Sequence, residues 1–167
     1  TFNLDEYYNI NKDDPQSYNV FMNNHLFSHI DIPKKNINVP NGKTNEKDII
    51  AYCKSYENKI NDYGGIDFQL LGIGRTAHIG FNEPGSNKNS VTRLIALDSI
   101  TRLDAANEFN GLSMVPEKAI TMGISTIINA KRIVLLAWGH TKSNIISQTI
   151  EGEISSSTPA TFLQNHQ

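Results

Sequence analysis

The stretch from residue 71 to residue 86, LGIGRTAHIGFNEPGS, carries the side chains best suited to acid–base chemistry. Glycines 72 and 74 follow an apolar run, and His78 and Glu83 come shortly after them. Histidine exchanges protons near neutral pH, because its unperturbed pKa is about 6.5. A nearby carboxylate stabilises the charged form of the ring. The pattern therefore predicts a proton-transfer site in a glycine-rich loop that follows a buried strand.

Two other stretches place chemistry where a predicted strand ends. In FNLDEY, Asp5 and Glu6 directly follow an apolar run, and in WGHTK an apolar strand passes through Gly139 into a helix with Lys142 in its first turn. Ligands of open α/β sheets bind beyond the carboxyl ends of the strands. A helix N-terminus with a nearby lysine suits an anion. Together the three stretches indicate proton transfer on a small phosphorylated molecule.

Each of these residues also has a purely structural interpretation. Asp5 could cap a turn, His78 could be a hydrogen-bonded polar group beside the core, and Lys142 could simply be solvated. His25 and His29 are four residues apart on one predicted helix, a spacing that suits a metal. No third ligand is evident, so no metal site is predicted.

The elements that must position these residues alternate between strands and helices. Strands are expected at residues 1–4, 66–74, 92–97, the beginning of 116–130, and 131–139. Helices are expected at residues 15–30, from 45 to about 64, at 100–109, in the second half of 116–130, at 140–152 and at 159–166. The strands are apolar runs without alternation, which favours a parallel sheet covered by helices on both faces.

Composition limits the class of protein. The chain has 167 residues, enough for one α/β domain over residues 1–167, and a net charge of −2 gives no electrostatic case for nucleic acid or an anionic membrane. No apolar run approaches the roughly 20 residues that span a bilayer. The single cysteine, Cys53, fits a reducing, cytoplasmic location. Since Thr1 is not methionine and begins inside a predicted strand, we expect the chain to be the C-terminal piece of a longer domain.

Five motifs resemble the glucosamine-6-phosphate deaminases. FNLDEYY, SYNVFM, GIGRTAHIGFNEPGS, KAITMG and IEGE occur in that order across nearly the whole chain. The sister group, the 6-phosphogluconolactonases, shares the fold and a related loop, but its motif does not continue as FNEP. The resemblance implies a Rossmann-like, three-layer α/β/α fold with a mostly parallel sheet, incomplete at its N-terminus. It implies a sugar phosphate as the only partner and no metal or organic cofactor, and it leaves a homo-oligomer open.

The implied reaction converts glucosamine 6-phosphate and water to fructose 6-phosphate and ammonia, through ring opening, isomerisation and deamination. By position, Asp5 resembles the base that moves a proton between C2 and C1. His78 resembles the residue that assists ring opening, and Glu83 resembles the carboxylate that works with it. Lys142 matches a lysine that contacts the phosphate.

Further positions follow from the same motifs. Glu6 and Gly74 are expected to contact the substrate, and a glycine lets the sugar approach the backbone closely. Arg93 falls where allosterically regulated members have an arginine for the phosphate of the effector. Thr76 is expected to belong to the catalytic set, at the position where the family usually has an aspartate, and the resemblance implies that His78 lies between residue 76 and Glu83. Asn107 stands where the family often has a phosphate-binding arginine.

These departures, and the absence of the family's N-terminal phosphate loop, keep two alternatives open. One is a non-catalytic sugar-phosphate sensor that kept the pocket and lost turnover. The other is a 6-phosphogluconolactonase-like hydrolase, against which FNEP argues. We also expect this chain on its own to be inactive.

Overall fold

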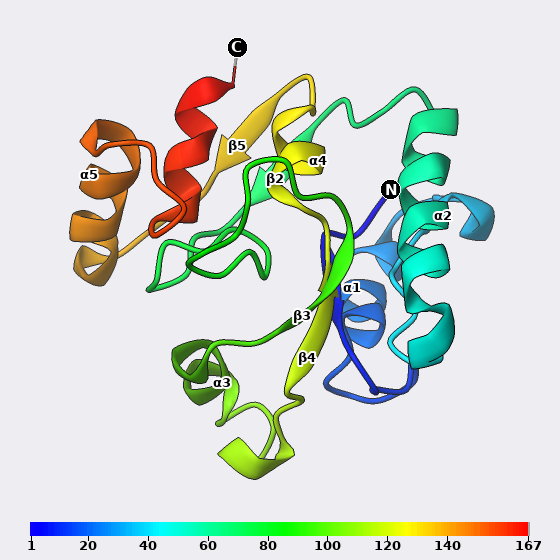
Figure 1. The fold of residues 1–167 in the computed structure, drawn as a ribbon. Helices are drawn as coiled ribbons and strands as arrows, with labels where there is room; N and C mark the ends of the chain where they lie inside the picture. Colours follow the sequence, from blue (N-terminus) through cyan, green and yellow to red (C-terminus); the bar gives the residue numbers. More distant parts are fainter. Residues whose placement is uncertain (167) are drawn as a thin grey trace.

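A three-stranded antiparallel sheet runs through the middle of the molecule in the computed structural model, which describes residues 1–166 (Figure 1). Its strands are β1 (Asp5–Tyr7), β3 (Arg93–Ala96) and β4 (Lys118–Thr121), in the order β1–β4–β3. Thr121 lies opposite both Asp5 and Arg93 in the register. Asp5 and Glu6 therefore lie within a strand, not after one as the sequence suggested.

A second, smaller sheet pairs β2 (Gln69–Leu71) with β5 (Ile133–Leu135) in parallel. The chain forms helices α1 (Tyr18–His25), α2 (Ile49–Asp62), α3 (Ser99–Ala105), α4 (Ile124–Ile128) and α5 (Ser143–Glu151), and a 3₁₀ segment at Pro159–Asn165. In Figure 1, α2 runs along one side of β3 and β4, and α5 and the 3₁₀ segment lie together on the other side of the view. No helix among residues 1–166 has the length and apolar character needed to cross a membrane.

The expectation of a mostly parallel sheet is wrong for the described residues. Strands without apolar–polar alternation predict a parallel sheet, and β4 (sequence KAIT) lacks that alternation, with its last three residues buried. Ala119 packs with Tyr7 and Phe81, while Ile120 packs on the other side with α2, so β4 is buried on both faces. Burial on two faces, and not strand direction, produces the apolar run.

Helix α2 follows the predicted pattern closely. Its four predicted core residues, Ile49, Cys53, Tyr56 and Ile60, are all buried, and the chain leaves the helix through two glycines with positive φ. Helix α1 starts later than predicted. Ser17 caps it by accepting a hydrogen bond from the Val20 amide, whereas the Asp14 side chain closes a turn before the helix.

The glycine-rich loop of residues 72–86 lies between two hydrophobic cores. Ile79 is fully buried in the core formed by the parallel pair, α4 and the C-terminal segment. Phe81, two residues later, is buried with Tyr7 and Phe109 in the core on the other side. An irregular loop with side chains in two cores is held in one place, and this loop carries the candidate catalytic residues.

Candidate active site

Buried hydrogen bonds fix the backbone of the loop that carries His78. The Asn82 side-chain amide donates to the carbonyls of Ile79 at 2.9 Å and Met122 at 2.8 Å. The Phe81 amide donates to Oγ1 of Thr121 at 3.1 Å. Asn82 is fully buried, so these bonds have no competition from water. The loop is therefore tied to the end of β4.

The structure brings His78, Glu83 and Thr76 together. Nδ1 of His78 lies 3.3 Å from Oε2 of Glu83, and the two side chains are only 16% and 12% exposed. Oγ1 of Thr76 lies 2.9 Å from the same nitrogen and 3.4 Å from Oε2 of Glu83. This is the three-residue arrangement that the resemblance implied.

Gly74 makes room for the His78 ring. A Cβ atom at position 74 would overlap Cε1 and Nε2 of the imidazole. The amide of Gly74 also donates to the carbonyl of His78 at 3.0 Å, which closes the loop on itself. Sequence reasoning placed Gly74 against the substrate, and the structure gives it a direct reason to be glycine in the packing of the histidine.

Glu83 is held in its charged form. Burial by itself raises the pKa of Glu83, but hydrogen bonds from His78 and Thr101, the charge of His78 and the backbone amide of Asp98 together bring it below its usual value. The Asp98 amide lies 3.3 Å from Oε1, at the point where α3 begins. Glu83 therefore lies at the N-terminus of a helix, where negative charge is favoured.

Thr101 is the member of this cluster that sequence reasoning missed. It is buried on α3, and its Oγ1 lies 3.3 Å from Nδ1 of His78. Nothing in the sequence marks it, because it is 23 residues from His78 and reads as an ordinary helical threonine. Only the packing of α3 against the loop brings the two together.

Asp5 has the protonation behaviour of a base that works near neutral pH. Burial raises the pKa of Asp5 to about 7, and the negative charge of Glu6 adds to the shift. The preceding residue, Leu4, accepts a hydrogen bond from the Met122 amide and packs against Gly80. The beginning of β1 therefore lies beside the loop that carries His78.

Glu6 has a structural role that fully occupies its carboxylate. The side chain is 2% exposed, and its oxygens accept hydrogen bonds from the amides of Tyr7, Tyr18 and Asn19 at 2.9 to 3.0 Å. Burial raises the pKa of Glu6, and these three donors partly offset the shift. Two of the donors open α1, so Glu6 joins β1 to that helix. Contact of Glu6 with the substrate stays a prediction.

The two cations singled out from the sequence bond to neutral oxygens. Nζ of Lys142 donates to the carbonyl of Ile73 at 2.7 Å, so the ammonium lies at the start of the glycine-rich loop. Arg93 is partly buried, which lowers its pKa, and it donates to Oδ1 of Asn82 at 2.9 Å and Oγ of Ser86 at 3.2 Å. Lys142 is thus placed next to the His78 loop, and Arg93 reaches that loop from β3.

Two other sequence features do not form part of this cluster. Asn107 is exposed beyond the end of α3. His25 and His29 bond to the backbone carbonyls of Phe21 and Asn24. Within residues 1–166, no group of three or more histidine, cysteine, aspartate or glutamate side chains could hold a metal ion.

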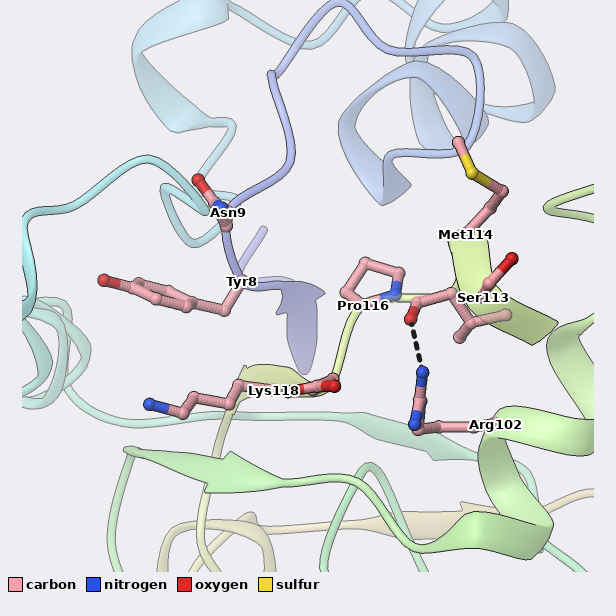
Figure 2. Close-up of a pocket in the computed structure, with 9 residues that line it drawn as sticks. Tyr8, Asn9, Arg102, Ser113, Met114, Pro116 and Lys118 are labelled. Atoms are coloured by element: carbon pink, nitrogen blue, oxygen red, sulfur yellow. Dashed lines mark hydrogen bonds between the residues drawn. The ribbon is translucent and has the colours of Figure 1, made fainter.

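A separate hollow of about 490 Å³ is lined by the residues that follow β1, the segment that leads into β4, and Arg102 of α3 (Figure 2). None of its lining residues is Asp5, His78 or Glu83. Arg102 reaches into this region and donates from Nη2 to the carbonyls of Leu112 at 3.3 Å and Val115 at 3.1 Å. The residue that follows Thr101 in α3 therefore anchors the helix to the next turn of the chain.

Taken together, the α/β fold and the buried histidine–carboxylate pair define a protein with an acid–base site beside a strand end. The family described as glucosamine-6-phosphate isomerases/6-phosphogluconolactonase matches residues 2–167, and the chain belongs to this family. The resemblance inferred from the motifs is confirmed.

Individual relatives agree with this assignment. A glucosamine-6-phosphate deaminase of Clostridium botulinum is 49% identical over 166 residues, which are 99% of this chain and 67% of the relative. One from Oceanobacillus iheyensis is 48% identical and covers 100% of this chain and 66% of the relative. The chain thus spans about two thirds of the length of these relatives.

Two solved structures match this chain, at different levels of sequence identity and TM-score. The structure of a monomeric glucosamine-6-phosphate deaminase matches with a TM-score of 0.96 at 44% identity, over 100% of this chain and 68% of the other. A 6-phosphogluconolactonase from Trypanosoma brucei matches with a TM-score of 0.74 at 18% identity, over 99% of this chain and 67% of the other. The second match shows a shared fold alone.

Proposed function

We propose that the protein converts glucosamine 6-phosphate and water to fructose 6-phosphate and ammonia. The observation that carries the proposal is the buried cluster of Thr76, His78 and Glu83 beside the strand that holds Asp5. The cluster supplies an imidazole that can exchange protons and an ionised carboxylate beside it, and Asp5 supplies a second base. The 49% identity to a deaminase supports the choice of reaction.

His78 serves ring opening. A proton leaves the anomeric hydroxyl and another reaches the ring oxygen, which gives the open-chain aldehyde. Histidine can take up the first proton and deliver the second near neutral pH. While the imidazole of His78 is protonated, the ionised carboxylate of Glu83, 3.3 Å from Nδ1, stabilises its positive charge.

Asp5 serves isomerisation. The carboxylate removes the proton from C2 while the aldehyde oxygen takes up a proton, which gives an enol with its double bond between C1 and C2. Asp5 then returns its proton to C1 while the nitrogen loses a proton, so the double bond becomes an imine at C2. The proton lost by the nitrogen balances the one gained by the oxygen. Water then adds to C2 and ammonia leaves, which gives the ketone of fructose 6-phosphate. A pKa of about 7 makes Asp5 both a competent base and a competent proton donor near neutral pH.

Lys142 is proposed to contact the phosphate. Its ammonium lies 2.7 Å from the Ile73 carbonyl at the start of the glycine-rich loop, and it has no carboxylate partner in the part of the chain that the structure describes. A phosphate bound there would replace a neutral acceptor with a charged one, which strengthens the hydrogen bond.

We further infer that the complete domain is a Rossmann-like, three-layer α/β/α structure whose sheet is mostly parallel. The parallel pairing of β2 with β5 and the TM-score of 0.96 to a longer deaminase support this inference. We also place the protein in the cytoplasm, because its one cysteine is free and buried.

The decisive experiment measures ammonia released from glucosamine 6-phosphate by the full-length protein. Turnover that falls on Asp5→Asn and persists in Asp13→Asn, an exposed carboxylate in the following loop, is the expected result. Binding of the sugar phosphate without ammonia release would identify a sensor. Hydrolysis of 6-phosphogluconolactone in its place would identify a lactonase.

A further inference from the structure

Two threonine hydroxyls from different elements contact the same nitrogen of His78. Oγ1 of Thr76, in the glycine-rich loop, lies 2.9 Å from Nδ1. Oγ1 of Thr101, on α3, lies 3.3 Å from Nδ1. Oε2 of Glu83 lies 3.3 Å from the same atom. Nδ1 therefore has three oxygen neighbours.

Counting protons in this cluster determines where the histidine proton must be. Ionised Glu83 can only accept, and the Thr76 hydroxyl donates to its Oε2 at 3.4 Å. Each hydroxyl has one proton, so a hydroxyl that donates to Glu83 can only accept from His78. Nδ1 must then carry a hydrogen, and all three oxygens around it become acceptors.

The opposite tautomer, with the hydrogen of His78 on Nε2, leaves the Glu83 carboxylate with fewer hydrogen-bond donors. If Nδ1 had a lone pair, the Thr76 hydroxyl at 2.9 Å would have to turn its proton away from Glu83 to donate to that nitrogen, and Nδ1 would have no hydrogen to donate to Glu83. The carboxylate would lose two donors while its oxygen faced a lone pair at 3.3 Å. Loss of donors to a buried carboxylate is costly, because few other partners are available there.

We propose that Thr101 is a positioning residue that, with Thr76, holds neutral His78 with its proton on Nδ1. The atom left to exchange protons is then Nε2, which lies over the bare backbone of Gly74. The inference about the tautomer does not depend on the proposed reaction. Its catalytic consequence, that Nε2 is the nitrogen that faces the sugar, rests on the proposed function.

Several contacts hold α3 where Thr101 can do this. Asp98 caps the helix by accepting a hydrogen bond from the Ile100 amide at 2.7 Å. Arg75, next to Thr76, pairs with Asp104 of α3 at 2.6 Å. Together with the Arg102 anchor, these contacts join the loop and the helix that supply the two hydroxyls.

The direct test is the ¹⁵N NMR spectrum of the His78 ring, read through two-bond couplings in the ¹⁵N-labelled protein at a pH where the ring is neutral. We expect Nδ1 to be protonated and Nε2 to be bare. Thr101→Val keeps the shape and removes the hydroxyl, so the Nε2–H form should become detectable. The double variant with Thr76→Val should increase it further, and Thr101→Ser should restore the original spectrum.

Thr126→Val is the matched control. Thr126 is also a buried helical threonine that donates to a glutamate, at 2.7 Å from Oε1 of Glu57, but it lies outside the His78 cluster. Its loss should leave the His78 spectrum unchanged. In an active protein, Thr101→Val should also lower kcat by about tenfold, since it removes one hydrogen bond to His78, the ring that becomes charged when it takes up a proton. Thr126→Val should not lower kcat.

A wild-type ring protonated on Nε2 would overturn the inference, even if Thr101→Val failed to fold. So would a Thr101→Val spectrum identical to that of wild type. A protein that showed the Nδ1–H spectrum but released no ammonia would refute the proposed function and leave the tautomer inference standing.

Discussion

At the scale of single residues, the raised pKa of Asp5 affects both the proposed activity and the stability of the fold. The folded-state pKa is about 7, against an ordinary value of about 3.9 in the unfolded chain. The folded protein therefore holds this proton more tightly. The contribution of this proton to the free energy of unfolding is fully present below about pH 4 and is lost as the pH rises towards 7.

Asp5→Asn should therefore be more stable than the wild type above pH 7 and catalytically weak. The gain could reach on the order of 4 kcal/mol, because each pKa unit corresponds to about 1.4 kcal/mol. Turnover should fall by about 10² to 10⁴, since the amide is no base. Urea denaturation at pH 5 and pH 8 is the measurement. Equal free energies of unfolding for the two proteins at both pH values would show that ionised Asp5 does not destabilise the fold.

Thr76→Asp tests the other half of the site. A second carboxylate beside Nδ1 favours the protonated ring, because opposite charges attract in this partly buried cluster. The midpoint of the His78 NMR titration should move to higher pH by about 1 unit, and the histidine-dependent limb of the pH–rate profile should move with it. Thr76→Asn, similar in size but uncharged, is the control. A midpoint that stays in place or falls would mean that residue 76 does not act on the histidine.

At the scale of elements, the sequence predicted features that depend on neighbouring residues in the chain and missed features that depend on tertiary packing. The buried face of α2 follows from helical spacing, and its end follows from Gly64 and Gly65, so both were predicted. The direction of β4 depends on which strands lie beside it, and an apolar run carries no such information. Thr101 was missed for the same reason, since its role arises from where α3 packs.

Helix α3 gives a prediction at this scale. The Nη2 atom of Arg102 bonds to two backbone carbonyls, and its Nε, among residues 1–166, is buried without a hydrogen-bond partner. Arg102→Met keeps an unbranched stem and removes the donors. We expect a loss of about 1–3 kcal/mol in unfolding free energy, because hydrogen bonds from charged groups are worth roughly that much.

Activity should fall along with stability in Arg102→Met, because α3 carries Thr101, which contacts His78, and begins at the Asp98 amide, which donates to Glu83. Thermal unfolding and ammonia release report the two effects. Arg132→Met, at an exposed position, is the control. A stable Arg102→Met protein with full turnover would mean that the anchor behind α3 has no influence on the site.

At the scale of the whole molecule, one face of the small parallel sheet is open. Leu70 and Val134 are paired in register and are 53% and 38% exposed. Phe68, just before β2, and Leu136, just after β5, lie two residues from them along the chain, and both are also exposed. A contiguous apolar face on a two-stranded sheet is a site of association, because soluble proteins seldom leave such patches uncovered.

We therefore expect the 167-residue chain to self-associate as its concentration rises, with this face at the contact. Sedimentation velocity over a hundredfold range of concentration should show the shift from monomer to larger species. Leu70→Thr combined with Val134→Thr should move that shift to higher concentration, since threonine keeps the strand preference and reduces the apolar area. Val91→Thr, at an exposed position next to β3, is the control and should change nothing. If the double variant associates as readily as the wild type, the contact lies elsewhere. A free β-strand edge, which pairs through backbone groups that these substitutions leave intact, would then be the driving feature.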